Sequence, residues 1–312
     1  MDTIAVLLKA PEDLVLSRLA LTPPGDDDIV VAVEWSGIST GTERLLWSGR
    51  MPHFPGMGYP LVPGYESVGR VISAGSQATR RPGERVFVAG ARCFGDVRGL
   101  FGGAAARLVV PDKRAGLLDE ATGAERVLLA LAATAWHAMA TPQAAVPDLI
   151  VGHGVLGRLL ARVAVLKGGA PVVWERDAAR RGGAQGYRVV DPDADERRDY
   201  RSIYDVSGDA GIIDLLVQRM APGGEIVLAG FYSDRIGFAF PPAFMREARI
   251  RIAAEWQEAD LRATREAIAS GALRLDGLVT HREAAERAPQ AYAQAFTDPT
   301  CLKMVLDWRD CA

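Results

Sequence analysis

The chain has 312 residues and a mass of 33.4 kDa, and 49% of its residues are apolar. This length exceeds the usual size of one domain, so we expect two domains, each with its own core. The net charge is −3, and Lys and Arg are scattered among acidic residues, which excludes nucleic acid as an expected partner.

No apolar run reaches the roughly 18 residues that a membrane-spanning helix needs. The N-terminal stretch MDTIAVLLKAPEDLVL lacks the basic segment and cleavage site of a signal peptide. We therefore expect a cytoplasmic protein without integral membrane contact, whose association with membranes, if any, is peripheral. Cys93, Cys301 and Cys311 form no CxxC pair, so neither disulfides nor a cysteine-rich zinc site is expected. Cys93 and Cys301 are expected to be small buried side chains.

Gly and Pro interrupt residues 1–122 about every eight to twelve residues, a spacing of strands and turns typical of a barrel-like β domain. The runs between them are rich in β-branched residues. They include IVVAVEW, SVGRVI, ERVFVAG and AARLVVP. This first half therefore predicts a compact, barrel-like β domain.

From Glu125 onward, helical and strand-like patterns alternate. A helical ERVLLALAATAWHAMA is followed by LIVGHG, VLGRLLARVAVLKGG, PVVWE, SIYDVSG, IIDLLVQRMAPGG and EIVLAGF, which predicts a parallel sheet wrapped by helices. Two amphipathic helices, LRATREAIASGAL and REAAERAPQAYAQAF, and a last strand, CLKMVLDW, are expected at the end. We expect an α/β fold with a catalytic domain from residues 1–122 and 262–312 and a dinucleotide-binding domain from residues 123–261.

A G-x-G-x-x-G motif lies between the strand-like LIV and the next expected helix. In this setting the first glycine permits a tight turn, the second lets a pyrophosphate approach the backbone, and the third lets the helix pack closely on the strand. The helix N-terminus then faces the phosphates, and an ordinary β-to-α turn is the alternative. The expected cofactor-binding residues of this loop are Gly152, His153, Gly154, Val155, Leu156 and Gly157; position in the chain alone places His153 near the pyrophosphate.

Glu175 ends PVVWE, where an acidic side chain accepts hydrogen bonds from the adenosine ribose hydroxyls. A carboxylate there repels a 2′-phosphate and favours NAD over NADP, although Arg176 beside it offers some compensation. The loops DVSGD and LAGFY follow later strands, and carboxyl ends of strands are where such sheets bind ligands. Ser207 and Gly230 in these loops are therefore expected near the nicotinamide half.

The chain as a whole resembles the medium-chain dehydrogenase/reductase superfamily. The resemblance rests on GISTGTE (37–43), PGYESVGRV (63–71), RPGERV (81–86), ATAWHA (133–138), VGHGVLG (151–157) and APGGEIVLAG (221–230). It implies a β-rich, GroES-like catalytic domain, a Rossmann domain, and a C-terminal segment that returns to the first domain.

The zinc ligands of the zinc-dependent members are missing. Those members carry a cysteine where Ser39 stands and a histidine where Tyr65 stands, and a third cysteine around residues 130–133 is also absent, as is the four-cysteine structural lobe. Neutral Ser and Tyr are poor zinc ligands, and Glu66 alone does not hold zinc. The resemblance therefore implies a zinc-free member.

Within the superfamily, GISTGTE, PGYESVGRV and FPPAFMREARIRIAAEWQ together resemble the dehydrogenases of bacteriochlorophyll biosynthesis, which oxidise the 3-(1-hydroxyethyl) group of a chlorophyllide or bacteriochlorophyllide to 3-acetyl with NAD. Without zinc, positive charge that develops as hydride departs spreads into the macrocycle, and hydroxyl groups carry the proton. Tyr65 is the first candidate, a plain packing role being its alternative. Thr42, Ser39 and Ser48 extend the expected relay, while Glu43 and Glu66 are expected to orient it or to be solvated or structurally paired carboxylates.

The loop 47–65, WSGRMPHFPGMGYPLVPGY, gathers aromatic residues and methionines that suit a large planar ligand. The expected substrate-pocket residues are Trp47, His53, Phe54 and Met57. His53 is a candidate to approach the magnesium of the substrate. The alternative, which is commoner for a histidine in a loop, is a side chain that is simply solvated.

Two other functions stay open at this stage. A zinc-free, NADPH-dependent quinone or enone oxidoreductase of the same superfamily would also lack the metal ligands, although Glu175 argues against it. A non-catalytic dinucleotide-binding protein is the second, because fold alone does not establish chemistry. EIVLAGF and FPPAF are candidates to join two copies of the chain into a homodimer, as in relatives.

Overall fold

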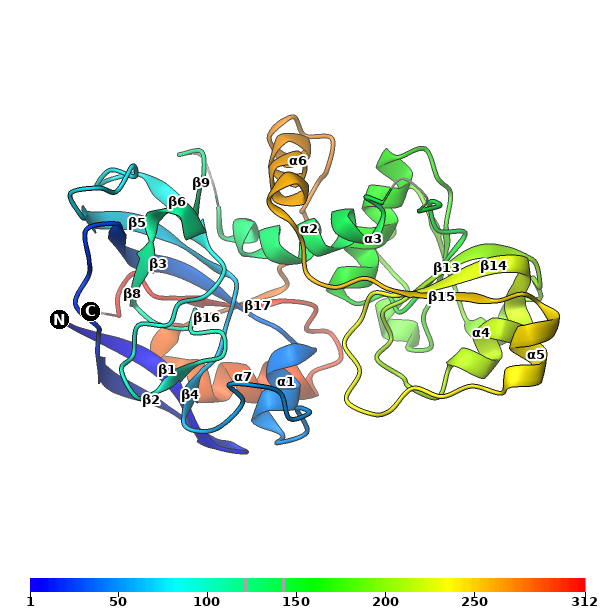
Figure 1. Ribbon diagram of the computed structural model, residues 1–312, viewed down its shortest axis with the longest axis horizontal. Helices are drawn as coiled ribbons and strands as arrows, with labels where there is room; N and C mark the ends of the chain where they lie inside the picture. The colour runs from blue at the N-terminus through cyan, green and yellow to red at the C-terminus, as the bar shows by residue number, and fades with distance from the viewer. Residues whose placement is uncertain (121–122, 142–143, 312) are drawn as a thin grey trace. The chain divides into compact units, whose positions relative to one another are not determined.

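The protein is described by a computed structural model that covers residues 1–120, 123–141 and 144–311. It forms two compact units (Figure 1). Unit 1 comprises Met1–Ala130 and Asp276–Ala312, and unit 2 comprises Leu131–Leu275. The second boundary follows helix α6 (Glu258–Ala269), so this helix lies wholly in unit 2, whereas the expected boundary at 261/262 would divide it.

The larger sheet of unit 1 has seven strands in the order β16-β17-β3-β5-β6-β9, with β8 also pairing β3. Its strands are β3 (Asp28–Ile38), β5 (Ser67–Ala74), β6 (Arg85–Val88), β8 (Arg107–Pro111), β9 (Ala115–Leu117), β16 (His281–Ala284) and β17 (Met304–Asp307). The expected β-rich runs thus form β3, β5, β6 and β8. The C-terminal run forms β17, which pairs antiparallel with β3 and so returns to the first unit as expected.

A four-stranded sheet, β2-β1-β4-β7, completes unit 1. Its strands are β1 (Asp2–Ala10), β2 (Asp13–Ala20), β4 (Leu61–Val62) and β7 (Arg98–Gly99). The β1–β2 hairpin was not predicted, because β1 is a continuous buried run instead of an alternating one. Its turn also uses Glu12, with a φ of 64°, where an Asn-Gly pair would have signalled a hairpin.

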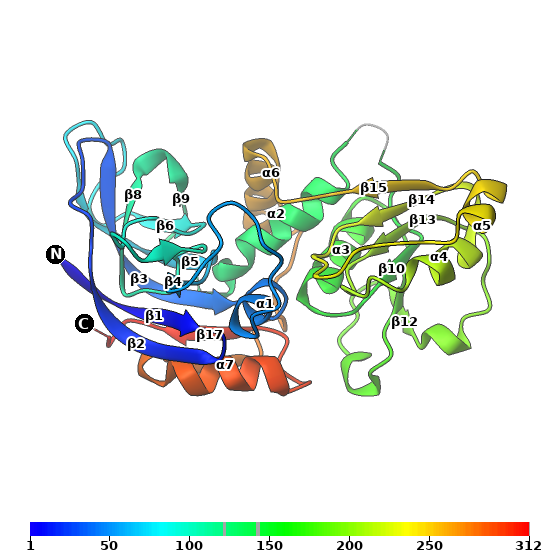
Figure 2. The same ribbon diagram turned by 60° about the horizontal axis from the view of Figure 1, so that its bottom comes forward.

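Two helices of unit 1 lie side by side in both views (Figures 1 and 2). They are α1 (Thr42–Trp47) and α7 (Ala288–Thr297). The prediction of a helix over the whole of 282–296 was wrong at its start, where residues up to Ala284 belong to β16. Parallel pairing of β16 with β17 stabilises this strand and overrides the local helical pattern.

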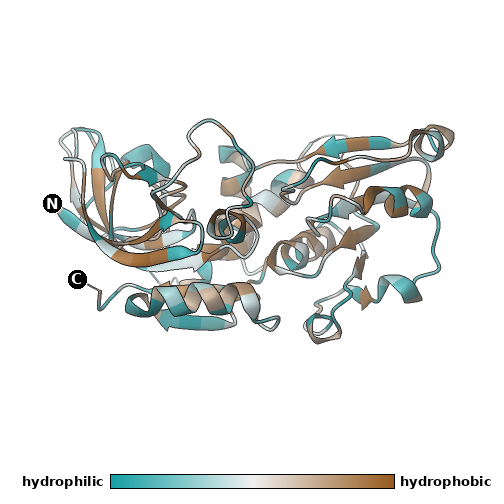
Figure 3. Cartoon of the chain, turned by 90° about the horizontal axis from the view of Figure 1, so that it is seen from below, coloured by the Kyte–Doolittle hydropathy of each residue, from teal (hydrophilic) through white to brown (hydrophobic). Residues whose placement is uncertain are grey.

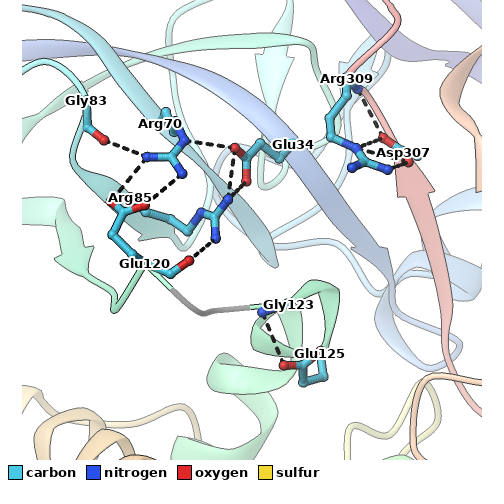
Figure 4. A network of polar contacts seen from close by, with 9 residues as sticks. All are labelled: Glu34, Arg70, Gly83, Arg85, Glu120, Gly123, Glu125, Asp307 and Arg309. Atoms are coloured by element: carbon cyan, nitrogen blue, oxygen red, sulfur yellow. Dashed lines mark hydrogen bonds and ion pairs between the residues drawn. The ribbon is translucent and has the colours of Figure 1, made fainter.

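An ion-pair network links three neighbouring strands of the seven-stranded sheet in unit 1 (Figure 4). Glu34 on β3 contacts Arg70 on β5 at 3.2 Å and Arg85 on β6 at 2.9 Å. Arg70 also contacts Glu120 at 2.8 Å. A carboxylate shared by two guanidinium groups fixes the register of three neighbouring strands.

Unit 2 is a six-stranded parallel sheet in the order β12-β11-β10-β13-β14-β15. Its strands are β10 (Leu149–Val151), β11 (Val172–Trp174), β12 (Arg188–Val190), β13 (Tyr200–Asp205), β14 (Met220–Leu228) and β15 (Arg249–Ile252). Its helices are α2 (Leu129–Ala138), whose first two residues belong to unit 1, α3 (Val155–Leu166), α4 (Ile213–Arg219), α5 (Phe240–Met245) and α6. The strand order reverses between β10 and β13, where doubly wound sheets bind ligands.

The strands of both units carry much of the apolar colour in Figure 3. Cys93 and Cys301 are buried, as expected. Among the described residues, no helix is both long and apolar enough to cross a membrane.

Candidate active site

The glycine loop follows β10 and leads directly into α3. Gly152 has a φ of 101°, a conformation that only glycine adopts easily. A Cβ on Gly157 would lie 1.8 Å from the Gly152 carbonyl oxygen, so helix and loop touch through bare backbone. A Cβ on Gly154 would meet nothing within 4 Å, and this residue caps α3 without a side-chain hydrogen bond. The helix N-terminus thus has open space beside it and backbone N–H groups that no side chain binds. This arrangement fits a pyrophosphate, so the loop could hold a dinucleotide.

The Glu175 carboxylate is fixed against the glycine loop. One oxygen accepts a hydrogen bond from the His153 backbone N–H at 3.1 Å, and the other accepts one from the Asp177 N–H at 2.9 Å. The acidic group therefore stands beside the loop in a set position. Arg176, the next residue, is exposed.

The imidazole of His153 is fully buried under the loop, and the backbone N–H is its contact with Glu175. Its ring nitrogens hydrogen-bond the Arg180 carbonyl at 2.7 Å and the Tyr187 hydroxyl at 2.9 Å. Burial lowers the pKa of His153 to about 4, although the Arg180 carbonyl opposes this shift. The ring is thus neutral and packed against protein groups. The place of His153 in the glycine motif did not indicate this packing. Val155 is buried and Leu156 half-buried, at the head of α3.

Asp205 joins the two loops that were expected near the nicotinamide. Its carboxylate accepts hydrogen bonds from the Ser207 N–H at 2.9 Å and the Tyr232 hydroxyl at 2.8 Å. Its backbone carbonyl accepts the Gly230 N–H at 3.1 Å. Burial raises the pKa of Asp205. An acid at the last position of a buried strand was the sequence signal that could have identified this anchor.

In unit 1, three of the expected relay residues come together. The half-buried Tyr65 donates its hydroxyl hydrogen to the Ser39 Oγ at 2.8 Å, and Thr42 also hydrogen-bonds Tyr65. Burial and the neighbouring Glu66 charge raise the pKa of Tyr65. Ser48 is not part of this group, because its hydroxyl donates to the Leu45 carbonyl within its own turn.

Glu66 is completely buried and forms an ion pair with Lys303, whose Nζ lies 2.7 Å from its Oε2. Gly37 lies against this carboxylate: a Cβ there would be 2.2 Å from Glu66 Oε2. Burial raises the pKa of Glu66, and Lys303 opposes that shift. Lys303 was missed from the sequence, because a single lysine before a strand gives no sign of a partner so far away in the chain.

Glu43 is a second buried carboxylate in the same group. Its Oε1 accepts the Ser39 N–H at 2.9 Å, and its Oε2 accepts the Tyr292 hydroxyl at 2.6 Å. Burial raises the pKa of Glu43 to about 7. Tyr292, on α7, was also missed from the sequence.

The expected pocket residues occupy two environments. Trp47, Phe54 and Met57 are half-buried and pack against a cluster that includes Leu46, and the Trp47 ring also lies 5.5 Å from Phe296. His53 is exposed.

Phe101 is an aromatic residue that the sequence analysis did not single out. It is 39% exposed, and its ring meets the Tyr65 ring edge-on at 5.7 Å.

Zinc does not fit this group of residues. Ser39 and Tyr65 bond to each other, and the Glu66 carboxylate is bound to Lys303. Within residues 1–120, 123–141 and 144–311, no cluster of three or more His, Cys, Asp or Glu could hold a metal ion. The hydroxyls of Ser and Tyr are weak zinc ligands, so these residues do not offer zinc an adequate set of ligands.

Known proteins resemble the chain at two levels. Residues 25–120 match the model of the alcohol dehydrogenase GroES-like domain. The proteins named 2-desacetyl-2-hydroxyethyl bacteriochlorophyllide A dehydrogenase from Rhodobacter capsulatus and Cereibacter sphaeroides are both 59% identical to it, over 312 and 315 residues, with 99% of each chain covered.

Solved structures share the fold at lower identity. Escherichia coli L-idonate 5-dehydrogenase has a TM-score of 0.85 at 15% identity, with 98% of both chains covered. A Pyrobaculum aerophilum alcohol dehydrogenase has a TM-score of 0.82 at 20% identity, covering 98% of this chain and 100% of that one. These likenesses confirm the expected fold class.

Proposed function

The chain belongs to the family of 2-desacetyl-2-hydroxyethyl bacteriochlorophyllide a dehydrogenases within the medium-chain dehydrogenase/reductase superfamily, and we propose that it oxidises a 3-(1-hydroxyethyl) group to 3-acetyl with NAD and without zinc. The observation that carries the reaction is 59% identity over 99% of the chain to two enzymes with that name. The substrate is then a chlorin or bacteriochlorin.

The proposed reaction removes a hydride and a proton from a secondary alcohol. NAD, when bound, supplies the acceptor for the hydride. The chain binds the pyrophosphate at the glycine loop, while Asp205 fixes the loops that carry Ser207 and Gly230. The Tyr65 hydroxyl takes the proton as it gives its own to Ser39, to which it is already hydrogen-bonded, and the relay through Ser39 and Thr42 releases one proton to solvent water.

The preference for NAD is proposed from Glu175. Its carboxylate is fixed beside the glycine loop by two backbone N–H groups, so a 2′-phosphate would meet a negative charge that cannot easily move away. The test compares kcat/KM for NAD and NADP in the parent and in Glu175→Gln. We expect kcat/KM of the parent to be higher with NAD than with NADP. In the variant the ratio of these two values should fall at least tenfold, because the repulsion between one negative charge and the 2′-phosphate is lost. A parent enzyme that already prefers NADP would contradict the proposal.

The absorption spectrum tests the reaction and its independence from zinc together. Chelator-treated protein is mixed with NAD and a 3-(1-hydroxyethyl) bacteriochlorophyllide. Because a 3-acetyl group extends conjugation, the long-wavelength band should move to the red, and the shift should require NAD. Activity that disappears on chelation and returns with zinc would overturn the zinc-free mechanism. No shift, with reduction of simple quinones by NADPH, would favour the enone or quinone reductase.

We also propose that two copies pair through the edge strand β15 and helix α5. Of the two segments expected to join the copies, FPPAF lies in α5, whereas EIVLAGF begins in β14, which is paired by β13 on one side and by β15 on the other. In the described part of the chain β15 pairs with β14 on one side and with no strand on the other, and exposed apolar side chains lie on β15 and in or just before α5. These side chains are Phe238, Phe240, Phe244, Met245 and Ile252, which are 44–77% exposed. Light scattering should give twice the 33.4 kDa mass, and Ile252→Glu should give the single-chain mass. A parent that scatters as a single chain would exclude the dimer.

A further inference from the structure

Glu43 lies next to the Ser39–Tyr65 pair, and the proton relay described above does not use it. The residue is 1% exposed and lies on α1. Through its two carboxylate oxygens it accepts hydrogen bonds from the Ser39 backbone N–H at 2.9 Å and from the Tyr292 hydroxyl on α7 at 2.6 Å. One buried carboxylate therefore connects the backbone that carries Ser39 to a C-terminal helix.

This connection depends on charge. An ionised carboxylate accepts both hydrogen bonds, whereas a protonated one carries a hydrogen on one oxygen. A hydrogen on Oε1 opposes the Ser39 N–H, which can only donate, whereas a hydrogen on Oε2 makes the Tyr292 hydroxyl turn and accept, and in both cases the charge that strengthens the bonds is lost. Protonation therefore weakens the hold on Ser39 or on Tyr292.

Several titratable groups face Glu43 from the surrounding elements. They are Tyr292 on α7, Tyr65 and Glu66 ahead of β5, and Lys303 ahead of β17. Burial raises the pKa of Glu43 most, and Glu66 adds to the shift, while Tyr292, the Ser39 N–H and Lys303 lower it. The resulting pKa of about 7 means that Glu43 changes its charge near neutral pH.

We infer that Glu43 and Tyr292 are positioning residues that hold the Ser39 and Tyr65 hydroxyls in their reactive arrangement while the Glu43 carboxylate is ionised. The inference deepens the proposed function and rests on it. Glu43 and Tyr292 act through Ser39 and need not touch the substrate.

The pH dependence of kcat tests this inference. The parent should lose activity as the pH falls through about 7, where Glu43 takes up a proton. Tyr292→Phe keeps the ring but removes a hydrogen bond that lowers the Glu43 pKa, so the acidic limb should move to higher pH. At pH 7, kcat should fall about tenfold, the usual size for one hydrogen bond to a charged group, and should recover toward the parent value at higher pH.

Two further variants complete the test. Glu43→Gln keeps the shape but has no charge to lose, so its kcat should be low and the acidic limb should disappear. Tyr204→Phe is the matched control, because Tyr204 is a buried tyrosine of unit 2 whose hydroxyl donates to the Ala138 and Ala145 carbonyls. Its pH profile should match that of the parent. Infrared difference spectra between acid and alkaline pH should show a protonated carboxyl in the parent that is missing in Glu43→Gln.

An acidic limb that stays in place in Tyr292→Phe, or that persists in Glu43→Gln, would overturn the inference while the parent still formed the 3-acetyl product. A parent that forms no 3-acetyl product would instead overturn the proposed function. The two failures are therefore distinguishable.

Discussion

The glycine loop of unit 2 and the hydroxyl cluster of unit 1 are built in opposite ways. The loop is one continuous stretch of backbone whose shape is set by the glycines from Gly152 to Gly157. The cluster consists of side chains from distant segments, with Ser39 and Tyr65 at its centre and Lys303 at its edge. A phosphate is bound by local backbone geometry, whereas proton transfer needs side chains whose environment is made by the whole domain.

The largest effects are expected from two substitutions in the glycine loop, which should act in different ways. Gly157→Ala places a Cβ 1.8 Å from a carbonyl oxygen and should lower the Tm by about 5 °C or more and abolish NADH binding. Gly154→Ala meets nothing within 4 Å, so its Tm should stay near that of the parent while its Kd for NADH rises about tenfold or more. NADH fluorescence and thermal unfolding measure both effects.

Gly182→Ala, at an exposed glycine with open space around it, is the control for this pair. If Gly154→Ala bound NADH as tightly as Gly182→Ala, the open space at the head of α3 would not be the pyrophosphate site.

The next effect concerns the cluster. Tyr65→Phe removes the hydroxyl that donates to Ser39, and kcat should fall about 100-fold, the lower end of what general acid–base groups contribute. The Kd for NADH should not change, because the glycine loop is untouched. Full turnover in this variant would remove Tyr65 from the mechanism and leave it as a packing residue.

A smaller effect is expected at Phe101, whose exposed ring stands edge-on to Tyr65. We expect it to be a contact surface for the planar macrocycle. Phe101→Ala should raise the KM for the tetrapyrrole about three- to tenfold, the contribution of one aromatic pair, and leave the KM for NAD unchanged. Leu117→Ala, at another exposed apolar residue of unit 1, should change neither value.

The smallest expected effects are changes in the stability of the fold with pH. Glu43 has a raised pKa, so the stability that its neutral form contributes is present below about pH 4.5 and is lost as the pH rises toward about 7. His153 has a lowered pKa, so its contribution is present above about pH 6.5 and is lost as the pH falls toward about 4.

Thermal unfolding from pH 4.5 to 7.5 measures both trends. The Tm of Glu43→Gln relative to the parent should rise with pH by a few degrees, and that of His153→Gln should fall. Parallel curves for the three proteins would mean that neither group titrates in its folded surroundings.

The same contrast explains what could be predicted from the sequence. The glycine motif, the strand before it and Glu175 follow local rules. Runs of β-branched residues between Gly and Pro predicted β3, β5, β6 and β8, and the alternation of helical and strand-like patterns predicted the parallel sheet. The β1–β2 hairpin and β16 did not follow their local patterns, because pairing with other strands decides them. Tyr292 and Lys303 could not be connected to Glu43 and Glu66, since those contacts span 249 and 237 residues of chain.

The return of the chain to unit 1 also orders events during synthesis. Residues Met1–Ala130 leave the ribosome before α7 and β17 have been synthesised. Glu43 and Glu66 therefore lack their partners Tyr292 and Lys303 until the whole of unit 2 has been synthesised. A buried carboxylate without its partners is costly, so the first unit cannot reach its final stability at that stage. The nucleotide-binding unit, by contrast, is continuous in the chain and is free to fold first.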